Sequence, residues 1–365
     1  MPRSMLITAA SLVPFLMLGC SKPPAEAEPE PTPAEAFAAR VDELRREKRI
    51  PGLAVVVLRD RTTVLSRGFG HADVERQVPV TPDTPFDIAS VTKPLSAVVA
   101  LRLAELGKLD LGAPMDTFDG FREFSAAARE NGGIFFGDYA TGPTRLTLRH
   151  VLMMEANGDP GSRFLYNPPS YSWASRPLAQ AGGKAFSALT EEHVFRPAGM
   201  TRSARTHRKL PLPANLTTDL ARPYHIDATG KVVRSDPPQP QGDGAAGGVI
   251  STAADLARFD VALDEGKLLT RLSRETMWSP GRAQSGASLP YGLGWFVKEV
   301  SGQTLVWHTG LWEEQYSALY LKVPARNLTL ILLANSDGLK WESRLDEAAV
   351  ERSPFAAAFL DVFLR

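Results

Sequence analysis

The chain has 365 residues, of which 44% are hydrophobic and 22% charged, a composition that is ordinary for a globular protein with one large domain or two smaller ones. Its 41 acidic and 41 basic residues balance, which argues against a nucleic-acid partner and against a polybasic membrane-binding patch. The single cysteine excludes an intrachain disulfide bond.

Residues 1–20 have the features of an export signal. Arg3 provides a short positive segment, and residues 5–18 form an apolar run that is too short to span a bilayer comfortably. The run ends at Gly19-Cys20, and a small residue before a cysteine at this place resembles the lipobox of bacterial lipoproteins. There Cys20 would be lipidated and become the mature N-terminus. The alternative is an ordinary signal peptide with an incidental cysteine.

Residues 21–35 consist mainly of Pro, Ala and Glu and contain no large apolar side chain, so we expect an extended tether here. A tether directly after a lipid anchor would hold the folded domain, residues 36–365, off the membrane surface. We therefore expect an exported bacterial lipoprotein that is anchored in a membrane and faces the periplasm or the cell surface.

The folded part shows strand patterns at both ends and helical patterns between them. Residues 35–48 have helical spacing, and β-branched runs at 53–58 and 62–69 predict a hairpin. Residues 111–285 are mostly helical and loop-like, without a convincing strand ladder. Strand patterns return at 291–299, 304–308, 317–323 and 328–334, and an amphipathic helix is predicted over 346–364. This order predicts an α+β fold in which both termini build one antiparallel sheet flanked by helices, with a mainly helical subdomain inserted at roughly 111–285.

Ser90 and Lys93 form the first candidate for chemistry. Apolar residues at helical spacing follow Ser90 as far as Gly107, and Pro94 fits the first turn of a helix that starts near Ser90. Residues three apart share a helix face, so the Lys93 amine can reach the Ser90 hydroxyl as its base. A helix N-terminus has unpaired N–H groups that can donate hydrogen bonds to a developing oxyanion, and the N–H of Ser90 is one of them. A chain of this length is expected to contain about one Ser-x-x-Lys by chance. The motif therefore indicates a nucleophile only if further catalytic residues occur elsewhere in the sequence.

Two further stretches supply such partners: Tyr166-Asn167-Pro168 and His308-Thr309-Gly310. With Ser90-Val91-Thr92-Lys93 before them, they resemble the ordered signature of the serine β-lactamase-like hydrolases. This family includes class C β-lactamases, D-Ala-D-Ala peptidases, D-aminopeptidases and esterases. The flanking stretches that also resemble it are 147–152, 196–200, 246–258 and 291–295, and the resemblance covers roughly residues 36–340.

The resemblance implies a β-lactamase/transpeptidase-like fold and a set of residue roles. Ser90 would be the nucleophile, Lys93 its base, and Tyr166 the group that passes the proton to the leaving group. The backbone N–H of Leu311 would be the second oxyanion donor. His308, Thr309 and Gly310 would line the substrate on a sheet strand.

The sequence departs from the family pattern in three places. Pro168 stands where the family has the asparagine that binds the substrate's side-chain amide, and proline has no such donor. His308 replaces the usual lysine and is mostly neutral near pH 7, which predicts a preference for substrates without a carboxylate beside the scissile bond. Turnover of carboxylated substrates is expected to improve as the pH falls toward 6. Compared with the family, the segment 147–166 looks short, and the segment 119–145 looks inserted.

Other patterns do not indicate a cofactor or a metal. Residues 242–247 match G-x-G-x-x-G but follow a Pro/Gln-rich loop, so we expect a loop that leads into a helix at Ala253. No H-E-x-x-H and no paired Cys/His spacing occurs, so no metal site is expected. Trp173, Trp307 and Trp312 are expected to pack in the core, with an acyl pocket as the alternative.

The sequence therefore predicts an exported serine hydrolase that forms an acyl-enzyme with a small-molecule or peptide ester or amide. Its other partner would be the membrane, through the lipid anchor. The first alternative is a D-amino-acid peptidase or a weak β-lactamase of the same family. The second is a catalytically idle relative that binds cell-wall peptide or a partner protein, which the intact Ser90, Lys93 and Tyr166 set disfavours.

Overall fold

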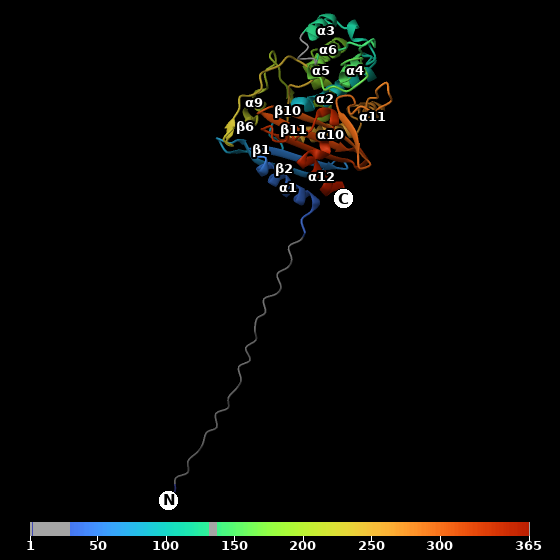
Figure 1. Ribbon diagram of the computed structural model, residues 1–365. Coiled ribbons are helices and arrows are strands. Elements are labelled where there is room, and N and C mark those ends of the chain that lie inside the picture. The colour runs from blue at the N-terminus through green and yellow to red at the C-terminus, as the bar shows by residue number, and fades with distance from the viewer. Residues whose placement is uncertain (1, 3–29, 131–136, 365) are drawn as a thin grey trace.

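The computed structural model describes residues 2, 30–130 and 137–364 (Figure 1). Apart from residue 2, the predicted export signal with Cys20 and most of the predicted tether lie outside these residues. No helix in the described part of the chain is long and apolar enough to cross a membrane. The first helix, α1 (Pro33–Glu47), begins two residues before the predicted end of the tether, because Thr32 and Glu35 form a capping box there.

The core of the fold is an antiparallel sheet with the strand order β3-β2-β1-β12-β11-β10-β9. Its first strands are β1 (Gly52–Arg59), β2 (Thr62–Asp73) and β3 (Val78–Pro79). Its last strands are β9 (Phe296–Val300), β10 (Gln303–Trp312), β11 (Tyr316–Val323) and β12 (Leu328–Ala334). The two groups join where β1 pairs with β12, with Leu53 opposite Ala334. The predicted sheet built from both termini is therefore confirmed.

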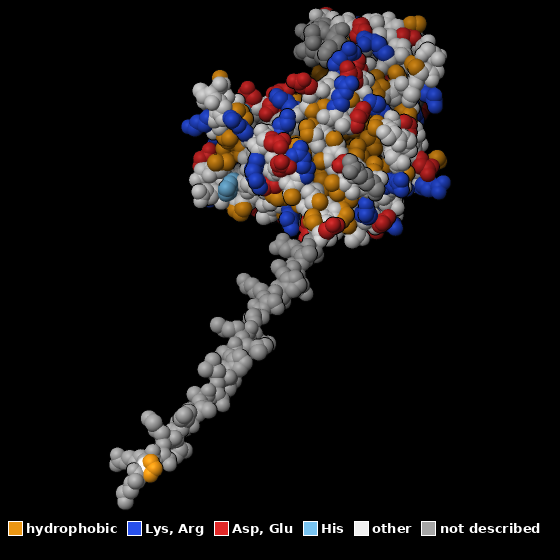
Figure 2. Space-filling model, turned by 60° about the horizontal axis from the view of Figure 1, so that its bottom comes forward, with side chains coloured by type: hydrophobic (Ala, Val, Ile, Leu, Met, Phe, Trp, Pro, Cys, Tyr) orange, Lys and Arg blue, Asp and Glu red, His pale blue; other side chains and the backbone are white. Residues whose placement is uncertain are grey.

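Helices cover both faces of this sheet. On one face α1 packs against α12 (Pro354–Leu364), where Phe37 meets Phe359 and Phe363 edge-on (Figure 1). On the other face lie α2 (Thr92–Glu105) and α10 (Ala253–Asp264). Every residue of β11 and β12 is buried, as expected for strands that are covered on both sides. On the face turned forward in Figure 2, acidic and basic side chains are interspersed with apolar ones.

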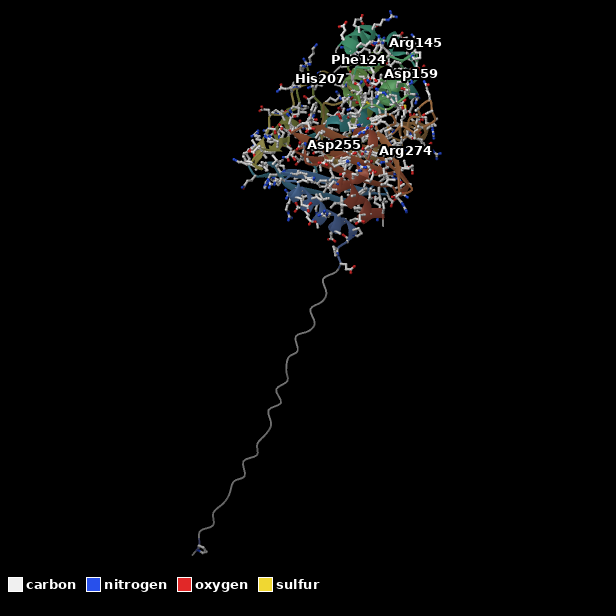
Figure 3. The ribbon with its side chains drawn as sticks, viewed as in Figure 1. Phe124, Arg145, Asp159, His207, Asp255 and Arg274 are labelled. Atoms are coloured by element: carbon white, nitrogen blue, oxygen red, sulfur yellow. The ribbon has the colours of Figure 1, made fainter. Side chains whose placement is uncertain are left out.

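The helical subdomain lies at the end of the molecule opposite α1 and α12, and Figure 3 places Phe124, Arg145 and Asp159 there. The helices of the middle region are α3 (Phe121–Glu130), α4 (Leu148–Leu152), α5 (Pro168–Trp173), α6 (Ser175–Gly182), α7 (Phe186–Thr190), α8 (Arg196–Ala198), α9 (Ala214–Asp219) and α11 (Arg271–Met277).

The expectation that residues 111–285 contain no strand ladder is wrong in part. Strand β8 (Val249–Ser251) pairs with β4 (Phe86–Asp87) on one side and with β5 (Ala204–Arg205) on the other. Strand β6 (Tyr224–Ile226) pairs with β7 (Val232–Arg234). Strands of two or three residues are too short to show an alternating pattern in a sequence. The β4–β8 pair matters for the site, because it joins the segment before Ser90 to the loop that leads into α10.

Two predicted boundaries also differ from the structure. The strand predicted from residue 291 begins only at Phe296, because Gly294 takes a left-handed backbone with φ of +77° just before it. The helix predicted from residue 346 begins at Pro354, since the residue before a proline disfavours the helical conformation. Two short 3₁₀ turns, Leu345–Glu347 and Val350–Arg352, take the place of its first part.

Strand β10 passes very close to the backbone in front of Ser90, and only a glycine permits this approach. A Cβ atom on Gly310 would lie 2.2 Å from the carbonyl oxygen of Ile88. By contrast, the nearest atoms to a Cβ on Gly247, which also faces this region, would be 3.9 Å away.

We predict that Gly310→Ala destabilises the fold by about 1–3 kcal/mol, because backbone atoms on both sides must move to relieve the overlap. Gly247→Ala is the matched control and should be close to neutral, since its methyl group meets nothing at short range. Urea unfolding followed by fluorescence measures both effects. Equal unfolding midpoints for the two variants would show that β10 does not depend on this close approach.

Candidate active site

Ser90 lies in a short 3₁₀ turn, Ala89–Val91, between β4 and α2. Ala89 has a φ of +46°, a left-handed backbone that residues other than glycine seldom adopt. The buried carboxylate of Asp87 accepts a hydrogen bond from the Ala89 N–H at 2.8 Å and so holds this turn. Burial raises the pKa of Asp87 to about 6. The turn places the Ser90 hydroxyl at the N-terminal end of α2.

Lys93, one turn into the helix, is fully buried, and its Nζ lies 2.7 Å from the Ser90 Oγ and 3.0 Å from the carbonyl oxygen of Ala246. In the part of the chain that the structure describes, no Asp or Glu forms an ion pair with Lys93. Burial therefore lowers the pKa of the Lys93 amine well below its ordinary value. A neutral amine at this distance can take the proton of the Ser90 hydroxyl.

Tyr166 completes the cluster from the loop before α5. Its phenol hydrogen bonds with the Ser90 side chain, and the Lys93 Nζ lies 5.0 Å from its ring centroid. Burial raises the pKa of Tyr166 above its ordinary value, so the phenol keeps its proton at neutral pH. Three predicted residues from two separate segments are thus brought together around one hydroxyl group.

The predicted substrate strand, residues 308–311, forms the part of β10 beside the Ser90 turn. Strand β9 pairs with β10 only as far as the Phe296–Trp307 pair, so within the described chain residues 308–312 have a strand partner on the β11 side alone. A strand edge of this kind presents backbone N–H and C=O groups that can bind a substrate. Leu311 is 37% exposed, and its role as an oxyanion donor, which concerns its backbone N–H, stays a prediction.

His308 is enclosed rather than open to a substrate. Its Nδ1 lies 2.6 Å from the Thr309 carbonyl oxygen and therefore carries the proton, which leaves Nε2 to accept a hydrogen bond from the Tyr291 hydroxyl at 2.8 Å. Burial lowers the pKa of His308 well below its ordinary value. The expectation that His308 becomes charged near pH 6 is therefore wrong, because the sequence did not reveal its burial.

Asn167, the neighbour of Pro168, does not replace the family's asparagine that binds the substrate's side-chain amide. Its buried side chain caps α5 by accepting a hydrogen bond from the Ser170 N–H at 3.1 Å, and its Nδ2 donates to the Asn157 Oδ1 at 2.9 Å. Asn157 in turn donates to Asp138 at 2.9 Å. Asp138 belongs to the segment 119–145, so this apparent insertion supports the loop that carries Tyr166.

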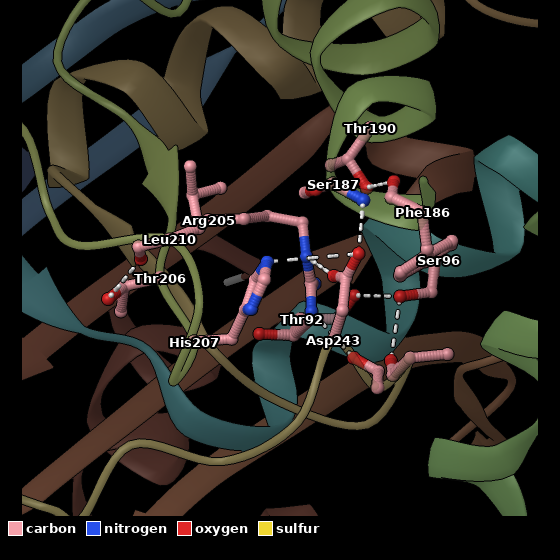
Figure 4. A network of polar contacts seen from close by, with 12 residues as sticks. Thr92, Ser96, Phe186, Ser187, Thr190, Arg205, Thr206, His207, Leu210 and Asp243 are labelled. Carbon is pink, nitrogen blue, oxygen red and sulfur yellow. Dashed lines mark hydrogen bonds and ion pairs between the residues drawn. The ribbon is translucent and has the colours of Figure 1, made fainter. Parts of the chain in front are cut away.

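Sequence reasoning missed the residues that fix the loop 242–247. The buried guanidinium of Arg205 pairs with Asp243 at 3.1 Å (Figure 4). It also donates to the carbonyl oxygens of Gly244 at 2.6 Å and Gly247 at 3.1 Å. Ser96 on α2 donates to the Ala245 carbonyl oxygen at 2.7 Å. These contacts place the next carbonyl group, that of Ala246, against Lys93. No motif links residues so far apart in the chain.

The three tryptophans take different places. Trp307 stacks on Phe296 at 5.4 Å, and Trp173 stacks on Phe124 at 5.2 Å, so both pack as expected. Trp312 lies across from Gly247, close to Ala89, and thus borders the space over the Ser90 turn. Within the described residues, no three side chains of His, Cys, Asp or Glu are grouped to hold a metal ion.

A Ser–Lys–Tyr cluster between an antiparallel sheet and a helical subdomain is the arrangement of the serine β-lactamase-like proteins. The sequence matches the Beta-lactamase family over residues 37–352, and the chain belongs to this family.

Individual relatives agree with this assignment. The chain is 29% identical over 269 residues to the putative penicillin-binding protein PbpX of Bacillus subtilis, covering 71% of this chain but only 65% of that one. Its fold is similar to the octameric penicillin-binding protein homologue from Pyrococcus abyssi, with a TM-score of 0.71, 22% identity and coverage of 89% of this chain and 76% of that one. It is also similar to D-amino acid amidase from Ochrobactrum anthropi SV3, with a TM-score of 0.69, 20% identity and coverage of 89% and 97%.

We predict that Ser90→Ala abolishes covalent labelling by a fluorophosphonate probe, because the hydroxyl beside a neutral amine is the reactive one. Lys93→Ala should slow labelling by roughly a hundredfold or more through loss of the base. Ser96→Ala, on the same helix, is the control and should still be labelled, since its hydroxyl is bonded to backbone carbonyl groups. Gel fluorescence over time gives the rates, and unchanged labelling of Ser90→Ala would contradict the assignment.

Proposed function

We propose that the protein is an exported, membrane-anchored serine hydrolase that acts through an acyl-enzyme on an ester or amide that is neutral near the scissile bond. The observation that carries this proposal is the buried Lys93 amine at 2.7 Å from the Ser90 hydroxyl, without an acidic partner among the described residues. In this arrangement a neutral amine can accept the proton of the Ser90 hydroxyl as the hydroxyl oxygen attacks a substrate.

The residues support a two-step reaction. Ser90 Oγ attacks the substrate carbonyl carbon and gives its proton to Lys93, while the N–H groups of Ser90 and Leu311 stabilise the oxyanion. The bond to the leaving group breaks, and the proton returns to the leaving oxygen or nitrogen through the Tyr166 phenol. A water molecule then attacks the acyl-Ser90 ester with Lys93 as base, which releases the acid and restores the serine.

The preference for a neutral substrate follows from His308, and Pro168 argues separately against recognition of a side-chain amide on the substrate. Both ring nitrogens of His308 are bonded within the protein, and the ring remains neutral, so it offers no charge to a carboxylate. Pro168 offers no side-chain donor to an amide.

Two alternative functions can be tested against this proposal: a D-amino-acid peptidase or weak β-lactamase, and a catalytically idle binding protein. Action on D-amino-acid peptides would match the amidase that shares this fold, and an idle relative would keep the fold without the reactivity. Short acyl esters, D-alanyl peptides and a chromogenic cephalosporin separate the enzymatic alternatives by their kcat/KM values. Absence of probe labelling at Ser90 would favour the idle relative.

We predict that kcat/KM for a carboxylated cephalosporin, divided by that for p-nitrophenyl acetate, stays constant between pH 6 and 8. His308 has a lowered pKa and is neutral throughout this range, so acid adds no cation for the carboxylate. The ratio is used because burial raises the pKa of two carboxyl groups into this range, Asp87 to about 6 and Glu155, which follows α4, to about 7. An effect that such a group has on both substrates alike cancels in the ratio. A severalfold rise of the ratio toward pH 6 would contradict the neutral His308.

The anchor proposal rests on the sequence pattern that ends at Gly19-Cys20. We predict that the wild type sediments with membranes after expression in a bacterial host, whereas Cys20→Ser moves to the soluble periplasmic fraction. Each acyl chain contributes about 0.8 kcal/mol per buried methylene, so two or more chains give stable binding. Ser21→Ala is the control and should remain with the membranes. A wild type that is fully soluble after export would disprove the anchor.

A further inference from the structure

A partly open pocket lies close to the candidate active site, on the opposite face of β10. It has a volume of about 300 Å³, and residues 309–311 of β10 form part of its wall. Side chains alternate along a strand, and Gly310 faces the backbone before Ser90, so the side chains of Thr309 and Leu311 point into this space instead. We refer to it as the β10 pocket.

The wall of the β10 pocket is mainly apolar. Besides the strand residues, it is formed by Phe296, Trp307, Leu339, Trp341, Leu345 and Ala349. A hydrogen bond of 3.0 Å from the Trp341 indole to the Ala349 carbonyl oxygen fixes the segment that closes it. A volume at the lower end of the range for small-molecule sites suits one small apolar group.

The charged side chains at the β10 pocket already have partners. Lys340 pairs with Glu313 at 3.2 Å and with Asp337 at 2.6 Å, and Arg344 pairs with Asp346. A charged ligand group would have to break these pairs, whereas an apolar group would leave them intact. The pocket is therefore suited to a neutral occupant.

A stack of aromatic rings leads from Tyr166 to the β10 pocket. The Tyr166 ring stacks on Phe296 with centroids 6.1 Å apart, and Phe296 stacks on Trp307 at 5.4 Å. Phe296 and Trp307 both belong to the pocket wall. In the proposed reaction Tyr166 returns the proton to the leaving group, so the leaving group lies on the side of Ser90 from which this stack extends.

We propose that the β10 pocket binds an apolar leaving group, so that the substrate is an ester or amide of a hydrophobic alcohol or amine. This inference rests on the proposed hydrolase function and adds the class of leaving group to it. Residues 309–311, which line the pocket, lie beyond Trp307, where β10 has no strand partner on the β9 side among the described residues. A larger space of about 520 Å³ between α5, α6 and the loop 242–244 is the competing site, but Asp243 and Arg176 line it.

The test uses acetate esters of methanol, butanol, hexanol and benzyl alcohol, with hydrolysis followed by acid release. All of them form the same acetyl-enzyme, so differences in kcat/KM report only binding and acylation. We expect kcat/KM to rise by roughly two- to fourfold for each added methylene until the pocket is full. Methyl esters with acyl chains of increasing length serve as the comparison series and should show a smaller dependence.

Two variants reduce the space in the β10 pocket, and a third variant, in the competing space, is the control. Ala349→Phe fills the pocket from within, and Leu345→Trp narrows it at an exposed position where misfolding is less of a risk. Each should lower kcat/KM for hexyl and benzyl acetate toward the value for methyl acetate and leave methyl acetate within about twofold. Ala179→Phe, in the competing space, should change neither.

The outcomes separate the two levels of the proposal. If the folded pocket variants keep the wild-type preference, or if Ala179→Phe removes it, the β10 pocket does not bind the leaving group. In either case Ser90 labelling remains, and the hydrolase function stands. If the wild type neither hydrolyses any ester nor reacts with the fluorophosphonate probe, the hydrolase function itself is wrong.

Discussion

The burial of the Lys93 amine without an ion-pair partner among the described residues is the constraint on which the site depends. A buried ammonium group with no anionic partner is costly, and a lysine in such a place responds by losing its proton. The surroundings fit this state, because the amine meets a hydroxyl, a carbonyl oxygen and two aromatic rings, those of Tyr166 and Tyr171. An ion pair here would fix the proton on the amine and remove the base.

The acidic residue on the loop that reaches Lys93 is paired with a buried base. Asp243 lies on the loop that reaches Lys93, but its carboxylate is held by the buried Arg205 and by the Ser187 N–H. Arg205 stacks over the Phe186 ring at 4.8 Å and also binds two carbonyl oxygens of that loop. The same contacts that neutralise Asp243 therefore place the Ala246 carbonyl group beside Lys93.

Distances across the site are set by three backbone segments rather than by one rigid element. The turn at Ala89 depends on the Asp87 carboxylate, strand β10 approaches through Gly310, and the Tyr166 loop rests on the Asn167–Asn157–Asp138 chain. Each segment comes from a different region of the sequence. Closing the sheet through the β1–β12 pair brings the first and last of the chain's strands together, and β10 reaches the Ser90 turn as a result.

The sequence by itself determined the features that depend on local spacing and composition. Hydrophobic periods located α1, the β1–β2 hairpin and the last three strands, and the resemblance in three short motifs predicted the residues that meet at Ser90. The placement of strands at both ends of the chain predicted one antiparallel sheet built from both termini, whereas the strand order came from the structure.

Only the tertiary structure decided the state of the ionisable groups and the partners that lie far apart. His308 was expected to respond to pH, but its burial against Tyr291 keeps it neutral, and burial depends on residues throughout the chain. Likewise, Arg205 and Asp243 carry no motif, because the loop they hold exists only once β5, β8 and α2 have packed together. The apolar space behind Leu311 arises from packing between β10 and residues 339–349, which no local pattern records.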